Sequence, residues 1–188
     1  MKRALKRISV LVLAFLLAVS VGTAVRDLRA DETTLMKQID ANKKIIAEST
    51  KLIEKDKKDD QALYARGSAY LTLGQIYTAM YSPKRTTEQN KIIKGLCEDA
   101  VTDFTVVIDL RPDLTQAHIM RGMAYGQMGL SHAAIADFTH VIEVDKKNAS
   151  AYYARGREYW EMGEYQKAKE DYDKAVEFDP RWKDNFYR

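Results

Sequence analysis

The residue types that most often bind metals or attack substrates are sparse in this sequence. The three histidines, His118, His132 and His140, are never four positions apart and have no adjacent acidic cluster, so a metal site is not expected. The single cysteine, Cys97, excludes an intramolecular disulfide; we interpret it as a packed thiol, with a disulfide-linked dimer as the alternative. The sequence has no glycine-rich phosphate loop and no nucleophile with an evident base. We therefore expect no cofactor and no enzymatic activity.

Charged residues, in contrast, recur at a constant spacing. Three acidic residues are each followed by an arginine 18 positions later. These pairs are Glu48 with Arg66, Asp103 with Arg121, and Asp137 with Arg155. Opposite charges at constant spacing predict structural ion pairs, and breaking such a pair is destabilising when it is buried. We favour pairs that join neighbouring structural units. The alternative joins each arginine to an acidic residue of its own unit, at spacings of 37, 16 and 16.

The segment 1–24 has the composition of a secretory signal. A basic stretch from Met1 to Arg7 precedes an apolar run, and Gly22-Thr23-Ala24 supplies the small residues that a signal peptidase recognises. We predict cleavage after Ala24, with Ala30 as a second choice. The alternative is an uncleaved membrane anchor, since the stretch from Ile8 to Val25 is near the lower limit of length for crossing a bilayer. The protein is therefore expected to be exported, periplasmic or secreted, or to be anchored by its N-terminus.

The charge balance argues against a nucleic-acid partner. The whole chain has a net charge of +3, but the leader holds four basic residues and no acidic one. Without the leader, 26 basic residues remain against 27 acidic residues, a net charge of −1. The basic excess therefore belongs to the leader, and the remainder of the chain lacks electrostatic attraction for nucleic acid.

An internal repeat indicates which elements position the charged residues. Arg121-Gly122 and Arg155-Gly156 are separated by 34 positions, and Arg66-Gly67 lies a further 55 positions upstream, which is one period plus 21. Alanines recur at the same period on the second half of each unit, at Ala100, Ala134 and Ala168. Small residues at these places predict two antiparallel helices in close contact, at about 8 to 10 Å between axes.

This pattern resembles the tetratricopeptide repeat (TPR) family in its Arg-Gly variant, over about residues 45 to 182. The resemblance implies an all-α fold, in which antiparallel helix hairpins stack as a right-handed α-solenoid. The expected units are an N-terminal half repeat that caps the stack (31–59), a first repeat with an insertion (60–114), two regular repeats (115–148 and 149–182) and a tail (183–188).

The insertion, at about 75–95, leaves two readings open. Both of its halves are compatible with helix, Ser82-Pro83 reads as a turn, and Thr86 or Thr87 can cap the second half. We expect one hairpin lengthened by about ten residues per arm, roughly 15 Å. It is either a tolerated surface elaboration or a partner-specific arm that uses Tyr77, Met80 and Tyr81.

The resemblance also implies a binding surface, because in that family the first helices line a concave face that holds peptides. The matching positions are Gln61, Tyr64, Ser68 and Leu71, then Gln116, Ile119, Met123 and Gln127, and finally Ser150, Tyr153, Arg157 and Trp160. The Lys and Asn residues by which some members hold chaperone C-termini are missing there. An apolar peptide with one acidic group facing Arg157 fits better.

The resulting functional expectation is an exported adaptor or assembly factor that binds another protein or a peptide. The alternative is a structural unit that self-associates by stacking through its C-terminal end, which would make a homo-oligomer.

Overall fold

The computed structural model of this chain describes residues 32–81 and 84–183. These residues form seven α-helices, one 3-10 helix and no strand. The predicted signal peptide or anchor, the predicted turn at Ser82-Pro83 and the tail beyond Lys183 lie outside the described residues.

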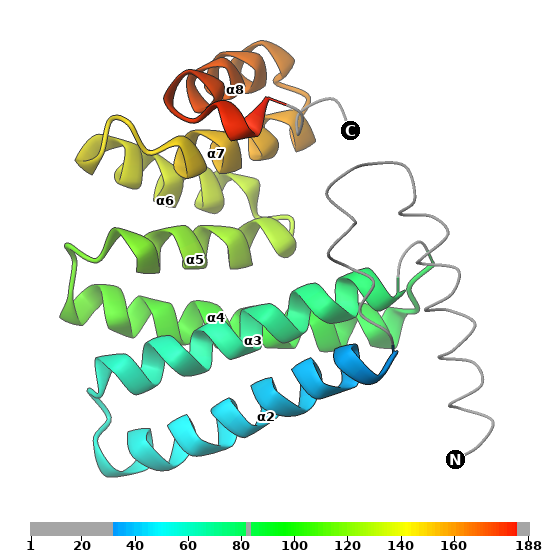
Figure 1. Cartoon of the computed structure of the whole chain (residues 1–188). Coiled ribbons are helices and arrows are strands. Elements are labelled where there is room, and N and C mark those ends of the chain that lie inside the picture. The colour runs from blue at the N-terminus through cyan, green and yellow to red at the C-terminus, as the bar shows by residue number, and fades with distance from the viewer. Residues whose placement is uncertain (1–31, 82–83, 184–188) are drawn as a thin grey trace.

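A single helix precedes three antiparallel hairpins that stack in chain order (Figure 1). The helices are α2 (Glu32–Lys55), α3 (Asp60–Tyr81) with α4 (Thr87–Leu110), α5 (Thr115–Gln127) with α6 (Ser131–Val144), and α7 (Ala149–Glu161) with α8 (Tyr165–Phe178). The predicted all-α solenoid of helix hairpins is confirmed.

The small residues of the repeat lie where the two helices of a hairpin meet. A side-chain carbon added at Gly122 would come within 2.8 Å of the Phe138 ring, and one added at Gly67 within 3.1 Å of Phe104. The recurring alanines are fully buried, Ala134 among them. Larger side chains would hold the helices apart, which explains why glycine and alanine recur with the period of the repeat.

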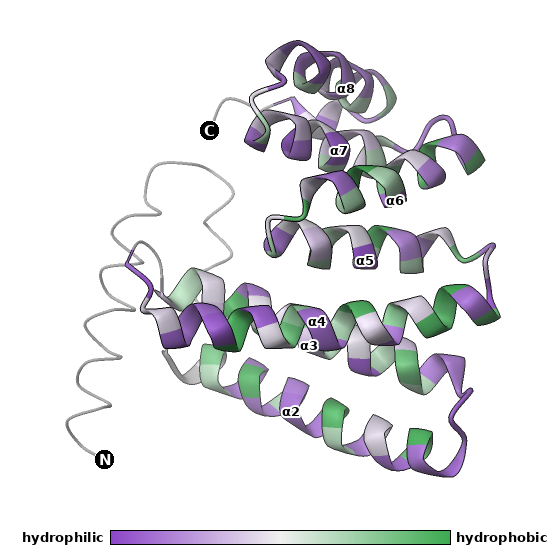
Figure 2. Ribbon diagram, turned by 180° about the vertical axis from the view of Figure 1, so that it is seen from behind, coloured by the Kyte–Doolittle hydropathy of each residue, from purple (hydrophilic) through white to green (hydrophobic). Residues whose placement is uncertain are grey.

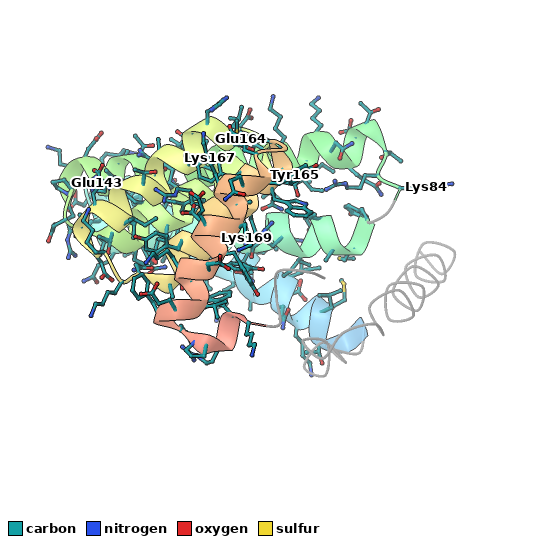
Figure 3. The ribbon with its side chains drawn as sticks, turned by 90° about the horizontal axis from the view of Figure 1, so that it is seen from above. Lys84, Glu143, Glu164, Tyr165, Lys167 and Lys169 are labelled. Atoms are coloured by element: carbon teal, nitrogen blue, oxygen red, sulfur yellow. The ribbon has the colours of Figure 1, made fainter. Side chains whose placement is uncertain are left out.

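The insertion lengthens the first hairpin, as predicted. In the regular repeats the first helix ends just before Gly129 or Gly163, whose φ angles of 74° and 77° suit glycine. Gly74 holds the same place in the first repeat, yet there the helix continues to Tyr81. Thr86 then caps α4 through a reciprocal pair of hydrogen bonds with Gln89. Seen from above, Lys84 marks the tip that projects beyond the shorter hairpins (Figure 3).

Helix α2 covers the N-terminal end of the stack. Ile39 and Ile53 are buried at 3% and 6% exposure, whereas Leu52 is 48% exposed. Leu52 occupies the repeat position of Val107 and Val141, which are fully buried against the first helix of their own hairpins. α2 has no such helix in the described chain, so this side of it stays open to solvent.

The C-terminal end of the stack is polar. α8 carries mostly hydrophilic residues (Figure 2), among them Lys169, which is labelled in Figure 3 and forms an exposed pair with Asp173. After α8, a 3-10 helix (Pro180–Trp182) turns the chain back, and Trp182 stacks on Tyr153 of α7 with ring centroids 4.2 Å apart. The 3-10 helix therefore covers part of the last hairpin.

Candidate functional site

The recurring arginines form bidentate ion pairs inside their own hairpins. Arg121 donates from Nε to Asp137 Oδ2 at 2.9 Å and from Nη2 to Oδ1 at 2.8 Å. Arg66 binds Asp103 in the same way, as Arg155 does Asp171. Each aspartate is almost fully buried, and its hydrogen bonds raise the pKa of the arginine. His118 Nδ1 lies 3.0 Å from Asp137 Oδ1 and adds a third contact to that carboxylate.

The predicted pairing between neighbouring units is therefore wrong. The spacing of 37 between Arg66 and Asp103 is compatible with an in-hairpin pair because both arms of the hairpin are lengthened, so Asp103 returns to the level of Arg66. Glu48 has no arginine because α2 lacks the first helix that would carry one. Its carboxylate is exposed and lies 3.8 Å from Lys44.

Neighbouring units are joined through hydroxyl groups instead. The Nη1 atom of each arginine donates to a threonine of the preceding helix at 3.1 or 3.2 Å; the pairs are Arg66 with Thr50, Arg121 with Thr105, and Arg155 with Thr139. Sequence reasoning missed these threonines, and it reached Asp171 only through the alternative in which each arginine pairs within its own unit. The signal was present, because each threonine precedes its arginine by a constant 16 positions.

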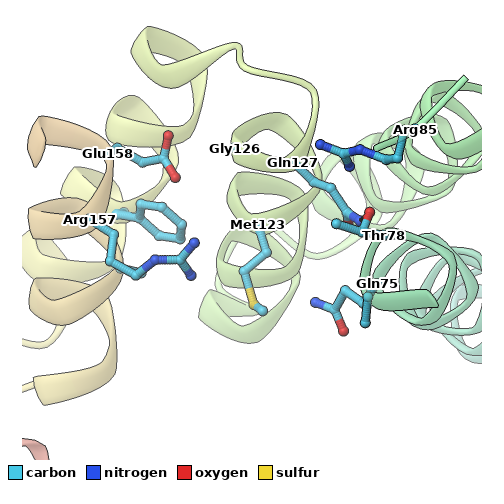
Figure 4. Close-up of a pocket in the computed structure, with 11 residues that line it drawn as sticks. Gln75, Thr78, Arg85, Met123, Gly126, Gln127, Arg157 and Glu158 are labelled. Atoms are coloured by element: carbon cyan, nitrogen blue, oxygen red, sulfur yellow. Dashed lines mark hydrogen bonds between the residues drawn. The ribbon is translucent and has the colours of Figure 1, made fainter. Parts of the chain in front are cut away.

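A concave pocket of about 460 Å³ lies between the first helices of the three hairpins. Its wall comes from α3, from Arg85 just before α4, from α5 and from α7, with Phe138 of α6 as a further lining residue (Figure 4). The lining residues are Gln75, Thr78, Ala79, Arg85, Met123, Gly126, Gln127, Phe138, Ala154, Arg157 and Glu158.

Three of the predicted contact residues line this pocket: Met123, Gln127 and Arg157. Met123 is 37% exposed and Arg157 is exposed, so both are open to a ligand. Gln127 donates from Nε2 to Thr78 Oγ1 at 2.7 Å, and its Oε1 is buried without a partner. The sequence therefore identified the middle of the pocket.

The other predicted contact residues lie elsewhere. Leu71 is 1% exposed in the core, so its assignment to the binding surface is wrong. Tyr64 packs edge-on against Phe104, Ile119 packs beside Val141, and Ser68 is half-buried.

At the C-terminal side, the 3-10 helix covers one of two predicted aromatic contacts. Tyr153 lies under Trp182. Trp160 is 47% exposed and contacts Tyr165 edge-on, with ring centroids 4.8 Å apart. Trp160 follows Arg157 by three positions on α7, so it lies close to the pocket but not in its wall.

The insertion supplies one whole side of the pocket, which sequence reasoning did not predict. Gln75, Thr78, Ala79 and Arg85 all come from residues beyond Gly74, where a regular first helix would have ended. The aromatic residues expected to form a partner arm face inward instead, since Tyr77 and Tyr81 stack on each other and pack against the core. The contribution of the insertion to the pocket could not be predicted from the repeat, because the inserted residues have no equivalent in the regular repeats.

Glu158 is a buried acid that breaks the repeat pattern. It is 7% exposed and stands where the earlier copies have the buried alanines Ala69 and Ala124. Gly126 makes room for it, because a side chain there would overlap the Glu158 carboxylate. Burial raises the pKa of Glu158, and the opposing effects of a hydrogen bond to Ser131 and of the charge on Arg157 are smaller.

The remaining reactive groups are enclosed. Cys97 is fully buried, and burial raises the pKa of its thiol to about 11. Among residues 32–81 and 84–183, His, Cys, Asp and Glu side chains form no group of three that could hold a metal ion. In the same ranges, no helix is both long enough and apolar enough to cross a bilayer.

Comparison with known proteins identifies the repeat. Two family models, each described as tetratricopeptide repeat, match residues 115–148 and 149–181. A search of curated proteins finds no match to this sequence.

Solved structures show the same fold. The first TPR of Spaghetti (RPAP3), bound to the HSP90 peptide SRMEEVD, is 19% identical, with a TM-score of 0.52; the match covers 70% of this chain and 85% of that one. TTC0263 of Thermus thermophilus, a thermophilic TPR protein, is 18% identical over 78% of this chain and 92% of its own, with a TM-score of 0.49. YrrB, a TPR protein with an unusual peptide-binding site, is 20% identical over 84% of this chain and 91% of its own, with a TM-score of 0.44. At these identities the likeness concerns the fold alone.

Proposed function

We propose that this chain, which is a tetratricopeptide repeat protein and a protein–protein interaction module, binds a segment of its partner in the concave pocket. The observation that carries the proposal is the composition of the pocket wall. Three successive first helices contribute to one cavity of about 460 Å³, which is within the usual size for a binding site. A segment lying across these helices contacts all three hairpins at once.

The character of the wall favours a peptide over a small apolar molecule. Met123 and Ala154 offer apolar surface, whereas Gln75, Gln127 and Arg157 offer polar groups. Amide side chains can bond the N–H and C=O groups of an extended backbone. The Spaghetti repeat, which shares the fold, is bound to a peptide, and this supports a peptide-like ligand here as well. The proposed role is binding without catalysis.

We further propose that the protein acts outside the cytoplasm. The proposal rests on the basic stretch, apolar run and small residues of positions 1–24. Mass spectrometry of the protein from its native host tests it. A mature chain that begins at Val25 supports export with cleavage; a membrane-bound chain that retains Met1 supports the anchor instead.

Photo-crosslinking tests the binding proposal. A photoreactive amino acid replaces Met123 in one variant and Val144 in a control variant. Both positions are exposed, at 37% and 59%, but Met123 lines the pocket and Val144 ends a second helix outside it. We expect a partner to be crosslinked from position 123 and not from position 144. Crosslinking of the same partner only from position 144 would place the binding surface outside the pocket.

A further inference from the structure

The pocket holds two arginines that form no salt bridge in the described chain. Arg157 reaches toward Met123 from α7, and Arg85 enters from the opposite side, beyond Gln127 (Figure 4). Every salt bridge found among residues 32–81 and 84–183 involves other residues. This contrasts with Arg66, Arg121 and Arg155, which all bind buried aspartates.

The nearest buried acid does not serve as their partner. Glu158 lies beside Arg157 in the sequence, but its carboxylate bonds with Ser131 at the start of α6. In Figure 4 both side chains extend from α7 in the same direction, with the carboxylate above the guanidinium of Arg157, and no salt bridge joins them. With two guanidinium groups and one shielded carboxylate, the pocket has a net positive charge. Guanidinium groups stay charged at any ordinary pH and form bidentate bonds with carboxylates.

The two cations have different origins. Arg157 belongs to a regular repeat, whereas Arg85 follows the extended part of α3. A repeat without the insertion would lack Arg85 and the side of the pocket formed by Gln75, Thr78 and Ala79. The insertion therefore determines both the shape and the charge of this half of the site.

We propose that the pocket receives an acidic segment of the partner protein, with one carboxylate at Arg157 and a second at Arg85. The side chain of Met123, which is 37% exposed, packs against the segment between the two carboxylates. In an extended segment, alternate side chains lie on one side about 7 Å apart, so two acidic residues separated by one residue both face the wall of the pocket. This inference rests on the proposed function and specifies its ligand.

Fluorescence anisotropy with short peptides tests the inference. The probe is a fluorescein-labelled, C-terminally amidated peptide, Gly-Ala-Glu-Leu-Glu-Ala-Gly, at low ionic strength, where charge pairing is least screened. Two further probes replace both glutamates by glutamine or by phosphoserine. The protein variants are Arg85→Gln, Arg157→Gln and the matched control Lys84→Gln. Lys84 is adjacent to Arg85, equally charged and exposed, but it does not line the pocket.

We expect the glutamate peptide to bind, and the glutamine peptide to bind at least about tenfold more weakly. Arg85→Gln and Arg157→Gln should each weaken binding of the glutamate peptide by about tenfold or more, and Lys84→Gln should not. Equal binding of the glutamate and glutamine peptides, or equal effects of Arg85→Gln and Lys84→Gln, overturns the inference. Binding of the phosphoserine peptide alone overturns it in favour of a phosphorylated partner.

The inference and the proposed function fail in different ways. If the glutamate peptide does not bind but crosslinking from position 123 still captures a partner, the inference of an acidic ligand is wrong, whereas the pocket is still supported as the binding surface. If crosslinking occurs only from position 144, the proposal that the pocket is the binding surface is wrong.

Discussion

Each recurring arginine connects three helices through one side chain. In the second hairpin, Arg121 binds Asp137 of its own hairpin with two hydrogen bonds between opposite charges, and it donates a single bond to the neutral hydroxyl of Thr105 in the preceding hairpin. A bidentate pair of opposite charges fixes the geometry of both groups more strongly than one bond to a hydroxyl. The ion pair therefore fixes the geometry within a hairpin, and the threonine sets the register between hairpins.

Removing the Asp137 carboxylate should destabilise the fold strongly. Asp137→Ala leaves Arg121 and His118 without their shared partner, and we expect a loss of about 3 kcal/mol in the free energy of unfolding. Glu48→Gln, at an exposed carboxylate, should change it by less than about 0.5 kcal/mol. Urea unfolding measures both. Equal effects of the two substitutions would support the pairing between neighbouring units that the constant acid-to-arginine spacing suggested.

The constant spacing was ambiguous for a physical reason. Any two positions in a repeat keep a fixed separation from one copy to the next, whether or not their side chains touch. Asp103 precedes Arg121 by 18 positions and Thr105 precedes it by 16, and both spacings recur. Only the three-dimensional arrangement distinguishes the threonine that bonds from the acid that does not.

Glu158 makes the stability of the fold depend on pH. Burial raises its pKa in the folded state above its value in the unfolded chain, so the folded chain binds the proton more tightly. The stabilising effect of that proton is complete below the unfolded pKa and is lost as the pH rises through the folded pKa. Above the folded pKa the carboxylate is ionised against its surroundings and destabilises the fold.

Glu158→Gln should therefore raise the melting temperature at pH 7. The difference from the unaltered protein should shrink as the pH falls below the ordinary carboxyl pKa, since both chains then carry a neutral group at this position. Thermal unfolding followed by circular dichroism at a series of pH values measures the effect. A lower melting temperature for Glu158→Gln at pH 7 would mean that the ionised carboxylate stabilises the fold.

At the scale of the helices, the hairpins depend on close contact at glycine. The Phe138 ring leaves no room for a side chain at Gly122, whereas nothing lies within 4 Å of the equivalent point at Gly95 in α4. Both glycines are inside helices, where alanine is favoured by about 1 kcal/mol. The two positions therefore separate packing from helix propensity.

Gly122→Ala should lower the free energy of unfolding by about 1 to 3 kcal/mol, because the helices must move apart or the Phe138 ring must shift. Gly95→Ala should raise it by about 0.5 kcal/mol. Chemical unfolding of both variants provides the measurement. Stabilisation by both substitutions would show that α5 and α6 are not held by close packing at Gly122.

The helix contacts at the recurring glycines and alanines could be predicted from the sequence, because small residues that recur with the period of a repeat are recognised directly. The sequence predicted the lengthened hairpin for a similar reason, since the turn signal at Pro83 and the cap at Thr86 bracket the tip. The prediction that Leu71 belongs to the binding surface is wrong. The matching position lines the concave face in the resembled family, but Leu71 is buried in the core here, where the helix continues past Gly74. Sequence reasoning also missed Arg85, because no repeat position corresponds to an inserted residue.

At the scale of the whole molecule, the outer face of α8 closes the stack. Positions that pack against the next hairpin are Val101 and Thr105 in α4, but the equivalent residues in α8 are Lys169 and Asp173. Lys169 Nζ lies 2.7 Å from Asp173 Oδ2 in an exposed pair. A further hairpin docked there would have to desolvate both charges.

We therefore expect a monomer, contrary to stacking through the C-terminal end. Static light scattering over a range of concentrations should give the mass of one chain throughout. The double substitution Lys169→Ile and Asp173→Thr restores the residue types of the inner hairpins and should promote self-association. A dimer of the unaltered protein that substitutions on α8 dissociate would contradict this expectation.

The account as a whole depends on the concave pocket as the surface that binds the partner. The most direct measurement is the affinity of the crosslinked partner, once purified, for two variants, Met123→Asp in the pocket and Val144→Asp at the end of α6 outside it. Isothermal titration should show binding weakened by at least about tenfold for Met123→Asp and unchanged for Val144→Asp. The reverse order, or no effect of Met123→Asp, would contradict the account.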